Sequence, residues 1–385
     1  MSNSLKGNII TPGGILYGAT VSYDGGIITG IESGSCCDCD NGLTYIAPGF
    51  VDIHVHGGGG SDFMDGTPEA YENALALHAS HGTATLLPTT LTSSDEELFH
   101  AFDVYRRVQD TELGTMLGGL HLEGPYFSPA QAGAQDPRYL RVPEREHYEK
   151  ILSEGRGIIR RMSVAPELEG ALELGTRLSE EGICASMGHS DALIDTVREA
   201  IGRGYTHLTH FYSAMSGMVR IDGYRHPGLI ECGYIFDSLT VEVIADGRHL
   251  PESILGLVFR AKGVEGCALV TDAMRGAGQS EGKTILGSLA HGQECYIEDG
   301  VAKMPGGMAF AGSVATADKL VRTAILAGAS LSDAVRMMSE TPARIVGLNV
   351  RGIIAVGKRA DFTLFDGDIN VKSVISGGKT IFEVN

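Results

Sequence analysis

The sequence contains no tryptophan, and its 30 lysine and arginine residues are outnumbered by 48 aspartate and glutamate residues. The net charge of −18 excludes nucleic acid and anionic membranes as partners, because both require a basic surface. No apolar run approaches the roughly 18 residues of a membrane span, and the first residues, MSNSLKGNIITPGG, lack the apolar core of a signal peptide. We therefore expect a soluble cytoplasmic protein. An anionic small substrate would need a local cationic pocket.

Cysteine is also scarce, since the chain has only seven, an odd number. A disulfide framework is therefore not expected. Cys36, Cys37 and Cys39 cluster in the stretch SCCDCD and could form a metal clip. No second Cys or His pair with zinc-finger spacing follows them, which favours a polar turn at this stretch.

Eight apolar, β-prone segments recur along the middle of the chain. They span residues 47–55, 82–92, 114–124, 158–167, 183–190, 205–211, 239–247 and 266–273. Helix-period segments lie between them, for example over 67–82, 167–182 and 191–204. Alternation of near-continuous apolar strands with amphipathic helices indicates parallel βα units. Eight units predict a closed (β/α)₈ barrel of the TIM type. An open doubly wound sheet is the alternative, but no GxGxxG turn follows the first strand.

The two ends of the chain differ from this middle. Residues 5–46 and 351–385 consist of short alternating segments with Gly-rich turns, a pattern typical of antiparallel hairpins. Neither end has enough strands for its own core, so we expect the two ends to pair. The predicted domains are a small β-sandwich over 1–46 and 347–385 and a barrel over 47–346. Two amphipathic helices are predicted before the C-terminal strands, over 315–328 and 330–347.

The stretch PGFVDIHVHGGGG, residues 48–60, places His54 and His56 at the end of an apolar strand, with four glycines after them. Residues i and i+2 of a strand face the same side, so both imidazoles face one centre. Other predicted barrel strands also end in polar side chains, namely Glu123, His189, His210, Asp246 and Asp272. These strand ends converge on one mouth of a barrel. Imidazoles and carboxylates gathered there predict a divalent-metal site rather than a core.

Further motifs carry a family resemblance. They are HLEGPY (121–126), GAQDP (133–137), MGHS (187–190), THFYSAM (209–215), RHPG (225–228), IADGRH (244–249), VTDAM (270–274) and FAGS (310–313). With them the chain resembles the amidohydrolase superfamily and, within it, the N-acetylglucosamine-6-phosphate deacetylases, essentially from end to end. The HxH pair alone is typical of the whole superfamily, whereas HLEGP followed by GHS and VTDA is much more specific.

The resemblance implies a metal centre. Glu123, His189 and His210 match the ligands that these deacetylases share, and His54 and His56 match a pair that holds a second ion in some members. One or two divalent ions per subunit are therefore implied, bridged by Glu123 where there are two. Zn²⁺ is expected first, and nitrogen and oxygen ligands also accept Fe, Mn or Co.

The resemblance also implies an activity, the hydrolysis of the acetamide of N-acetylglucosamine 6-phosphate to glucosamine 6-phosphate and acetate. Asp272 matches the catalytic carboxylate, which takes a proton from the attacking water and returns it to the departing nitrogen. The implied substrate contacts are Ala134, Gln135, Ser213, Ala214, Arg225, His249, Phe310 and Ala311. Among these, His249 polarises the acetamide oxygen and Phe310 covers the acetyl methyl group.

Two departures and two alternatives accompany this resemblance. Ser213 replaces an asparagine of the family, and the segment before Arg225 is longer than usual. Arg225 matches an arginine that reaches the phosphate bound by the neighbouring subunit, which implies a homodimer. Ser213 keeps open a related substrate, such as N-acetylgalactosamine 6-phosphate or an unphosphorylated amino sugar. The other alternative is a regulator that binds a sugar phosphate without catalysis, which the intact Asp272 and metal ligands disfavour.

Overall fold

The computed structural model of the protein describes residues 3–34, 44–307 and 309–384. Cys36, Cys37 and Cys39, weighed above as a metal clip, lie outside the described residues. The described cysteines are buried and free: Cys184, Cys232, Cys267 and Cys295.

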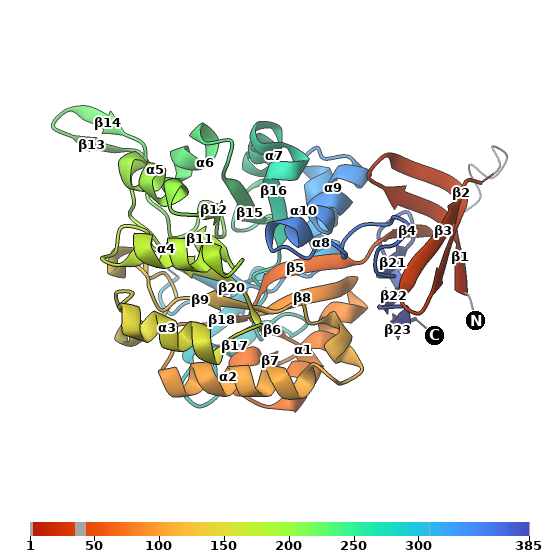
Figure 1. Ribbon diagram of the computed structural model, residues 1–385, viewed down its shortest axis with the longest axis horizontal. Coiled ribbons are helices and arrows are strands. Elements are labelled where there is room, and N and C mark those ends of the chain that lie inside the picture. The colour runs from red at the N-terminus through yellow and green to blue at the C-terminus, as the bar shows by residue number, and fades with distance from the viewer. Residues whose placement is uncertain (1–2, 35–43, 308, 385) are drawn as a thin grey trace.

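Eight parallel strands form a nearly closed barrel at the centre of the molecule (Figure 1). In order, they are β5 (Phe50–Val55), β8 (Thr83–Thr90), β9 (Leu120–Glu123), β10 (Ile159–Val164), β11 (Cys184–Met187), β12 (Tyr205–Leu208), β15 (Thr240–Ile244) and β16 (Cys267–Val270). The strands pair in chain order, and a parallel bridge between Val55 and Ala273 brings the first and last together. The predicted (β/α)₈ barrel is confirmed, and the doubly wound sheet is wrong.

Helices cover the outside of the barrel (Figure 1). They are α1 (Pro68–Ser80), α2 (Asp95–Val108), α3 (Arg145–Glu154), α4 (Ala171–Glu180), α5 (Ile194–Gly202), α6 (Leu229–Ile235), α7 (Glu252–Gly266), α8 (Ala317–Leu326), α9 (Leu331–Met337) and α10 (Glu340–Ile345). Local sequence sets where they begin. The Thr67 hydroxyl accepts a hydrogen bond from the Ala70 N–H at 3.2 Å, and Pro68 occupies the first turn, where no backbone donor is needed.

The helix predicted over 330–347 is divided into α9 and α10. Pro342 has no N–H with which to bond the carbonyl oxygen of Met338 four residues earlier. That carbonyl instead accepts a hydrogen bond from the backbone N–H of Val51, in β5, at 2.8 Å. The break therefore joins this helical segment to the first barrel strand.

A second sheet combines strands from both ends of the chain (Figure 1). Its order is β23 (Lys379–Glu383), β22 (Val371–Ser376), β21 (Phe362–Phe365), β4 (Tyr45–Pro48), β1 (Asn3–Thr11), β2 (Gly14–Asp24) and β3 (Ile27–Glu32). All its pairings are antiparallel except that of β1 with β4. Its apolar core includes Ile9, Val21, Ile46 and Phe362, all fully buried. The two ends thus form one β structure beside the barrel, as expected.

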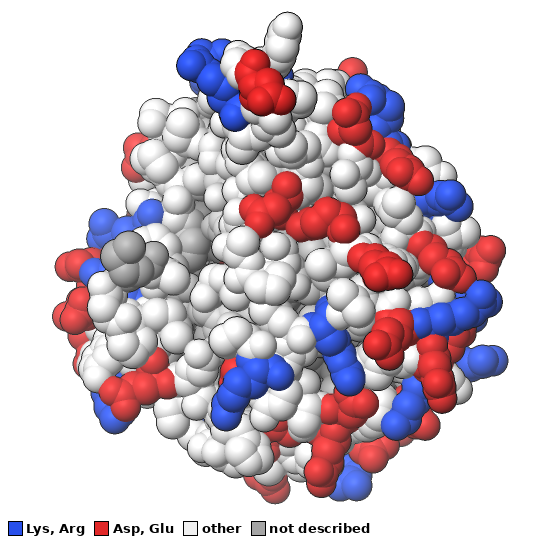
Figure 2. Space-filling view, turned by 90° about the vertical axis from the view of Figure 1, so that its left-hand side faces the viewer, with Lys and Arg blue, Asp and Glu red and all other residues white. Residues whose placement is uncertain are grey.

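Three further β elements of the described residues were not expected from the sequence, of which the shortest pairs β6 (Gly57–Gly58) with β7 (Ser61–Asp62). A four-stranded antiparallel sheet follows the barrel, with β17 (Gly282–Leu286), β18 (Gln293–Glu298), β19 (Val301–Lys303) and β20 (Phe310–Ser313). A hairpin of β13 (Val219–Ile221) and β14 (Tyr224–His226) projects at the upper left of Figure 1 and at the top of Figure 2.

The surface carries side chains of both charges. Acidic and basic side chains are interspersed over the face shown in Figure 2. Among the described residues, no helix is both long enough and apolar enough to cross a membrane.

Candidate metal centre and active site

The side chains predicted at the strand ends do converge on one mouth of the barrel. His54 lies in β5 and His56 follows it directly, while Glu123 is the last residue of β9. The other members follow β11, β12 and β16. His189, His210 and Asp272 have φ values of 50°, 30° and 46°, in the left-handed region that non-glycine residues rarely adopt. Such backbone strain is concentrated at functional sites, where the surrounding structure supports it.

One group of candidate ligands consists of His54, His56 and Asp272, whose ligand atoms lie within 4.8 Å of one another. The Nε2 atoms of the two imidazoles are 3.3 Å apart. Oδ1 of Asp272 lies 3.4 Å from Nε2 of His54 and 3.2 Å from Nε2 of His56. All three side chains are buried, so their lone pairs face a common point with little solvent around it.

A second group consists of Glu123, His189 and His210. Nε2 of His210 lies 3.0 Å from Oε1 of Glu123 and 3.1 Å from Nε2 of His189. Glu123 also contacts the first group, because its two oxygens lie 3.3 Å from Nε2 of His54 and of His56. The Glu123 carboxylate therefore stands between the two groups.

The donor set fits one or two divalent metal ions. Imidazole nitrogens paired with carboxylate oxygens are the usual ligands of Zn²⁺ and related ions. Without a cation, pairs of imidazole nitrogens at 3.1 and 3.3 Å would face one another inside the protein. His210 and His189 present such a pair beside one carboxylate, and His54 and His56 present another. Each group thus offers three ligand atoms to one point, which leaves coordination positions for water or substrate.

The electrostatics of the cluster favour bound positive charge. Burial raises the pKa of Glu123, but His54 and neighbouring imidazoles outweigh it, so the pKa lies well below its usual range. The same opposition, with His54 and His56 as partners, lowers the pKa of Asp272. Burial lowers the pKa of His54, whereas Asp272, Glu123 and Glu242 together raise it to about 9. The carboxylates are therefore ionised and attract protons or a metal cation to the imidazoles.

A cavity of about 380 Å³ opens directly over the cluster. This volume lies within the usual range of small-molecule sites. Predicted site residues that line it are His56, Glu123, Ala134, Gln135, His189, His210, Ser213, Ala214, His249, Asp272 and Phe310. The structure therefore brings most of the predicted ligands and substrate contacts around one space.

Two polar side chains of the cavity, Gln135 and His249, are held in place by hydrogen bonds. Nε2 of Gln135 donates to Glu123 at 2.6 Å, and its Oε1 accepts the backbone N–H of Thr92 at 2.9 Å. Nδ1 of His249 lies 2.8 Å from a carboxylate oxygen of Asp246, which leaves Nε2 as the free ring nitrogen. Both therefore have a fixed orientation at the mouth of the barrel.

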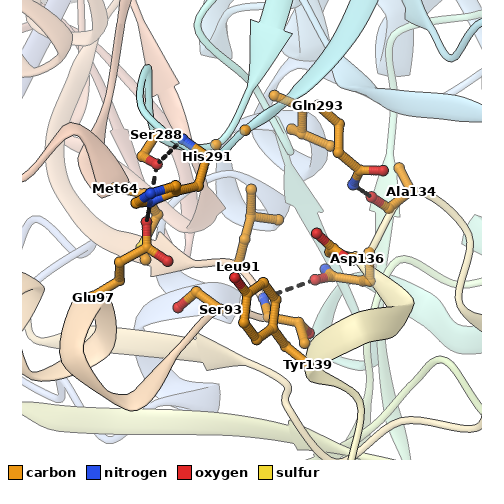
Figure 3. Close-up of a pocket in the computed structure, with 15 residues that line it drawn as sticks. Met64, Leu91, Ser93, Glu97, Ala134, Asp136, Tyr139, Ser288, His291 and Gln293 are labelled. Atoms are coloured by element: carbon orange, nitrogen blue, oxygen red, sulfur yellow. Dashed lines mark hydrogen bonds and ion pairs between the residues drawn. The ribbon is translucent and has the colours of Figure 1, made fainter.

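The loop that carries Gln135 is also held from the opposite side, in a small neighbouring pocket (Figure 3). Nε2 of Gln293, in β18, donates to the carbonyl oxygen of Ala134 at 2.6 Å. In the same pocket His291 contacts Glu97 of α2 at 2.9 Å, and Ser288 contacts the same carboxylate at 3.0 Å. The unexpected four-stranded sheet thus supports one wall of the cavity.

Two predicted substrate residues lie outside the cavity lining. Arg225 is exposed on β14 of the projecting hairpin, and Ala311 is buried within β20 beside Phe310. The hairpin also exposes apolar side chains, with Tyr224 76% exposed. Arg225 therefore lies on a hairpin that extends away from the barrel of its own chain.

Sequence reasoning missed two residues beneath the cluster. Glu242 of β15 and Arg161 of β10 form a fully buried ion pair, and Glu242 contacts Nδ1 of His54 at 2.7 Å. The signal was a charged residue inside an apolar barrel strand, as in TVEVIADG. Such a residue faces the barrel interior and needs a partner there. Asp246 was noted at a strand end, but its contact with His249 was not foreseen.

Comparison with known proteins agrees with this geometry. The amidohydrolase family profile matches residues 45–381. The chain is 32% identical to the N-acetylgalactosamine-6-phosphate deacetylase of Escherichia coli O157:H7 over 91% of each chain. It is 33% identical to the N-acetylglucosamine-6-phosphate deacetylase of Bacillus subtilis, over 88% of this chain and 85% of that one.

A solved structure gives the same result. It is a mutant N-acetyl-D-glucosamine-6-phosphate deacetylase from Mycobacterium smegmatis in complex with N-acetyl-D-glucosamine-6-phosphate. It aligns with a TM-score of 0.90 and 32% identity over 98% of this chain and 99% of that one. The chain therefore belongs to the amidohydrolase family and, within it, to the metal-dependent amino-sugar-phosphate deacetylases.

Proposed function

We propose that this enzyme hydrolyses the acetamide of N-acetylglucosamine 6-phosphate to glucosamine 6-phosphate and acetate. The observation that carries the proposal is the position of Asp272 beside two groups of metal ligands that share Glu123, under one cavity. The names of the relatives at 31–33% identity support the choice of substrate class.

The metal is assigned to these same residues. We propose that Glu123, His189 and His210 hold one ion, and that His54, His56 and Asp272 hold a second. Zn²⁺ is the expected metal, with Fe, Mn or Co as alternatives. A divalent ion supplies a nucleophilic water at neutral pH and polarises a carbonyl oxygen.

The remaining chemistry falls to residues of this chain. The lowered pKa of Asp272 makes it a carboxylate at neutral pH, despite burial, because His54 and His56 lie beside it. Its free oxygen takes the proton of the attacking water and then delivers it to the nitrogen of the departing amine. When the His249 ring carries both protons, Nδ1–H donates to Asp246 and Nε2–H donates to the acetamide oxygen as negative charge develops on it.

Substrate orientation is assigned to the cavity walls. The Phe310 ring, in edge contact with His249 at 4.8 Å between centroids, covers the acetyl methyl group. Ala134, Gln135, Ser213 and Ala214 contact the sugar and its 6-phosphate side, and Ala311, buried next to Phe310 in β20, supports that wall from behind. This arrangement aims the acetamide at Asp272 and leaves the phosphate toward the cavity mouth.

We further propose a homodimer in which Arg225 binds the phosphate held by the partner subunit. Arg225 lies outside the lining of its own cavity, on a hairpin whose exposed side chains include Ile221 and Tyr224. Exposed apolar groups of this kind are typical of protein contacts. A small domain of residues 1–46 and 347–385, a barrel of 47–346 and a cytoplasmic location complete the proposal.

A second candidate substrate is N-acetylgalactosamine 6-phosphate. The E. coli relative with that name is as similar to this chain as the glucosamine enzymes are. Ser213 supports it as well, because the shorter side chain changes the donor on the sugar side of the cavity.

Acetate release from a panel of sugars tests both candidates. The panel contains N-acetylglucosamine 6-phosphate, its galactosamine epimer and the two unphosphorylated sugars. The proposal expects the highest kcat/KM for N-acetylglucosamine 6-phosphate. A higher value for the epimer would favour the second candidate. Tight binding without release of acetate from any sugar would favour the non-catalytic regulator.

A further inference from the structure

A fully buried ion pair lies beneath the metal centre. The Arg161 guanidinium contacts Oε2 of Glu242, and both side chains are 0% exposed. Arg161 also donates to the carbonyl oxygen of Ile53, at 3.2 Å, and to the hydroxyl of Thr209, at 3.0 Å. Burying two charges costs free energy that their attraction repays only with good geometry and further hydrogen bonds. The pair is therefore tightly held and its position is fixed.

The other oxygen of Glu242 reaches the metal centre. Nδ1 of His54 donates to Oε1 of Glu242 at 2.7 Å, and the backbone N–H of His210 donates to the same atom at 2.9 Å. With Nδ1 occupied as a donor, Nε2 of His54 carries the lone pair. That atom lies 3.3 Å from Glu123 and 3.4 Å from Asp272, at the candidate ion position. Glu242 thus fixes both the tautomer and the direction of this ligand.

His54 differs in this respect from the other three imidazoles of the centre. Nδ1 of His56 lies 3.2 Å from a backbone carbonyl oxygen, and Nδ1 of His189 lies 2.8 Å from another. Nδ1 of His210 is buried with no hydrogen-bond partner among the described residues. A carboxylate partner makes an imidazole a stronger ligand than a neutral carbonyl does. The strengthened imidazole belongs to the group formed with His56 and Asp272.

We propose that Glu242 is a positioning residue for the ion of the His54, His56 and Asp272 group. Held by Arg161, it presents His54 as a ligand and thereby sets the affinity of this ion without touching the ion or the substrate. The inference rests on the proposed occupancy by two ions and is independent of which sugar is hydrolysed.

Metal binding to the chelator-treated full chain tests this role. Zn²⁺ is titrated against a chromophoric chelator, and wild type is compared with Glu242→Gln and with His54→Gln, which identifies the affected site. Glu242→Gln should lower the Zn²⁺ affinity of one of the two sites, that of His54, His56 and Asp272, by about 10- to 100-fold. The Zn²⁺ affinity of the other site, formed by Glu123, His189 and His210, should change by less than about threefold. The melting temperature of the metal-free protein checks that each variant folds.

His207→Gln is the matched control. Nε2 of His207 contacts Oε2 of Glu242 at 3.3 Å, so this variant disturbs the same buried network without removing the contact to His54. It should leave both affinities near wild type. Should Glu242→Gln fail to fold because Arg161 is left unpaired, the double variant Arg161→Met/Glu242→Gln is measured instead, with the same expected loss.

Three results would overturn the inference. The first is a Glu242 variant that binds both ions as tightly as wild type does. The second is an equal loss in the His207 control, which indicates a purely structural network. The third is a wild-type chain that binds only one Zn²⁺ at saturation. Two ions bound with no acetate released would instead contradict the proposed function and leave the role of Glu242 in place.

Discussion

His249 and Asp246 form a fixed pair at the mouth of the barrel, with Nδ1 of the imidazole 2.8 Å from Oδ2 of the carboxylate. The other oxygen of Asp246 accepts the backbone N–H groups of Arg248 and His249 at 2.8 and 2.9 Å. The backbone of residues 248 and 249 therefore holds the carboxylate in place, and the carboxylate in turn orients the His249 ring. Nδ1–H of His249 donates to this carboxylate, so Nε2 can donate into the cavity when the ring carries both protons, with Asp246 as its counter-charge.

Replacement of Asp246 by asparagine should lower kcat with little change in KM. The neutral amide removes the negative charge beside the His249 ring, so the ring with protons on both nitrogens, whose Nε2–H donates to the oxyanion, loses its counter-charge. We expect a loss of about 10- to 100-fold, below the cost of removing an oxyanion donor outright. Steady-state acetate release measures it, with Asp237→Asn as an exposed control. A kcat within twofold of wild type would exclude this role for the pair.

Asp272→Asn should abolish most turnover but leave a folded protein that still binds metal through Glu123, His189 and His210. The amide cannot accept the proton of water, and one proton-transfer role is worth about 10²–10⁴-fold in rate. Single-turnover acetate release and metal analysis of the same sample measure the two effects. Turnover near the wild-type rate would show that another group moves the proton.

Arg225→Ala should raise KM for N-acetylglucosamine 6-phosphate far more than for the unphosphorylated sugar, because only the former presents a phosphate to the guanidinium. Arg220→Ala is the matched control, since Arg220 is paired opposite Arg225 in the same hairpin. Equal effects on both sugars, or equal effects of the two variants, would count against a phosphate contact. Light scattering of the same proteins reports the dimer.

The free energy of unfolding should decrease as the pH is lowered from about 6.5 to about 4, in part because of His78. Burial lowers the pKa of His78 to about 4, while its Nε2 donates to the Gly57 carbonyl oxygen at 2.9 Å. In the unfolded chain the pKa is about 6.5. Acid therefore protonates the unfolded state first and favours unfolding across this window.

Urea unfolding of metal-free protein at pH 7 and pH 5 measures this effect. His78→Gln keeps a donor for Gly57 but cannot titrate, so its free energy of unfolding should depend less steeply on pH. The pH dependence of the free energy of unfolding should correspond to up to one fewer proton taken up on unfolding in the variant. Identical slopes for the two proteins would show that His78 does not contribute.

Much of the barrel and its centre could be predicted because both depend on local signals. Apolar strand periodicity gives the eight strands, and parallel strand ends meet at one mouth, so His54, His56 and Asp272 were expected to converge. The break between α9 and α10 was not predicted, because it depends on a long-range hydrogen bond from Val51 to Met338.

The supporting residues were missed for a related reason. Glu242 and Arg161 are 81 positions apart, and neither has a neighbour in sequence that indicates its partner. The four-stranded sheet that supports Ala134 through Gln293 was missed as well. Its short strands of mixed polarity are only partly buried and lack the continuous apolar pattern of the barrel.

The most direct test of the account is a metal titration of acetate release. Zn²⁺ is added back to chelator-treated enzyme in the presence of N-acetylglucosamine 6-phosphate, while acetate and bound metal are both quantified. The account predicts no release without metal, and release that rises with occupancy up to two ions per chain. Full activity in the metal-free enzyme, or no acetate from the fully loaded enzyme, would contradict it.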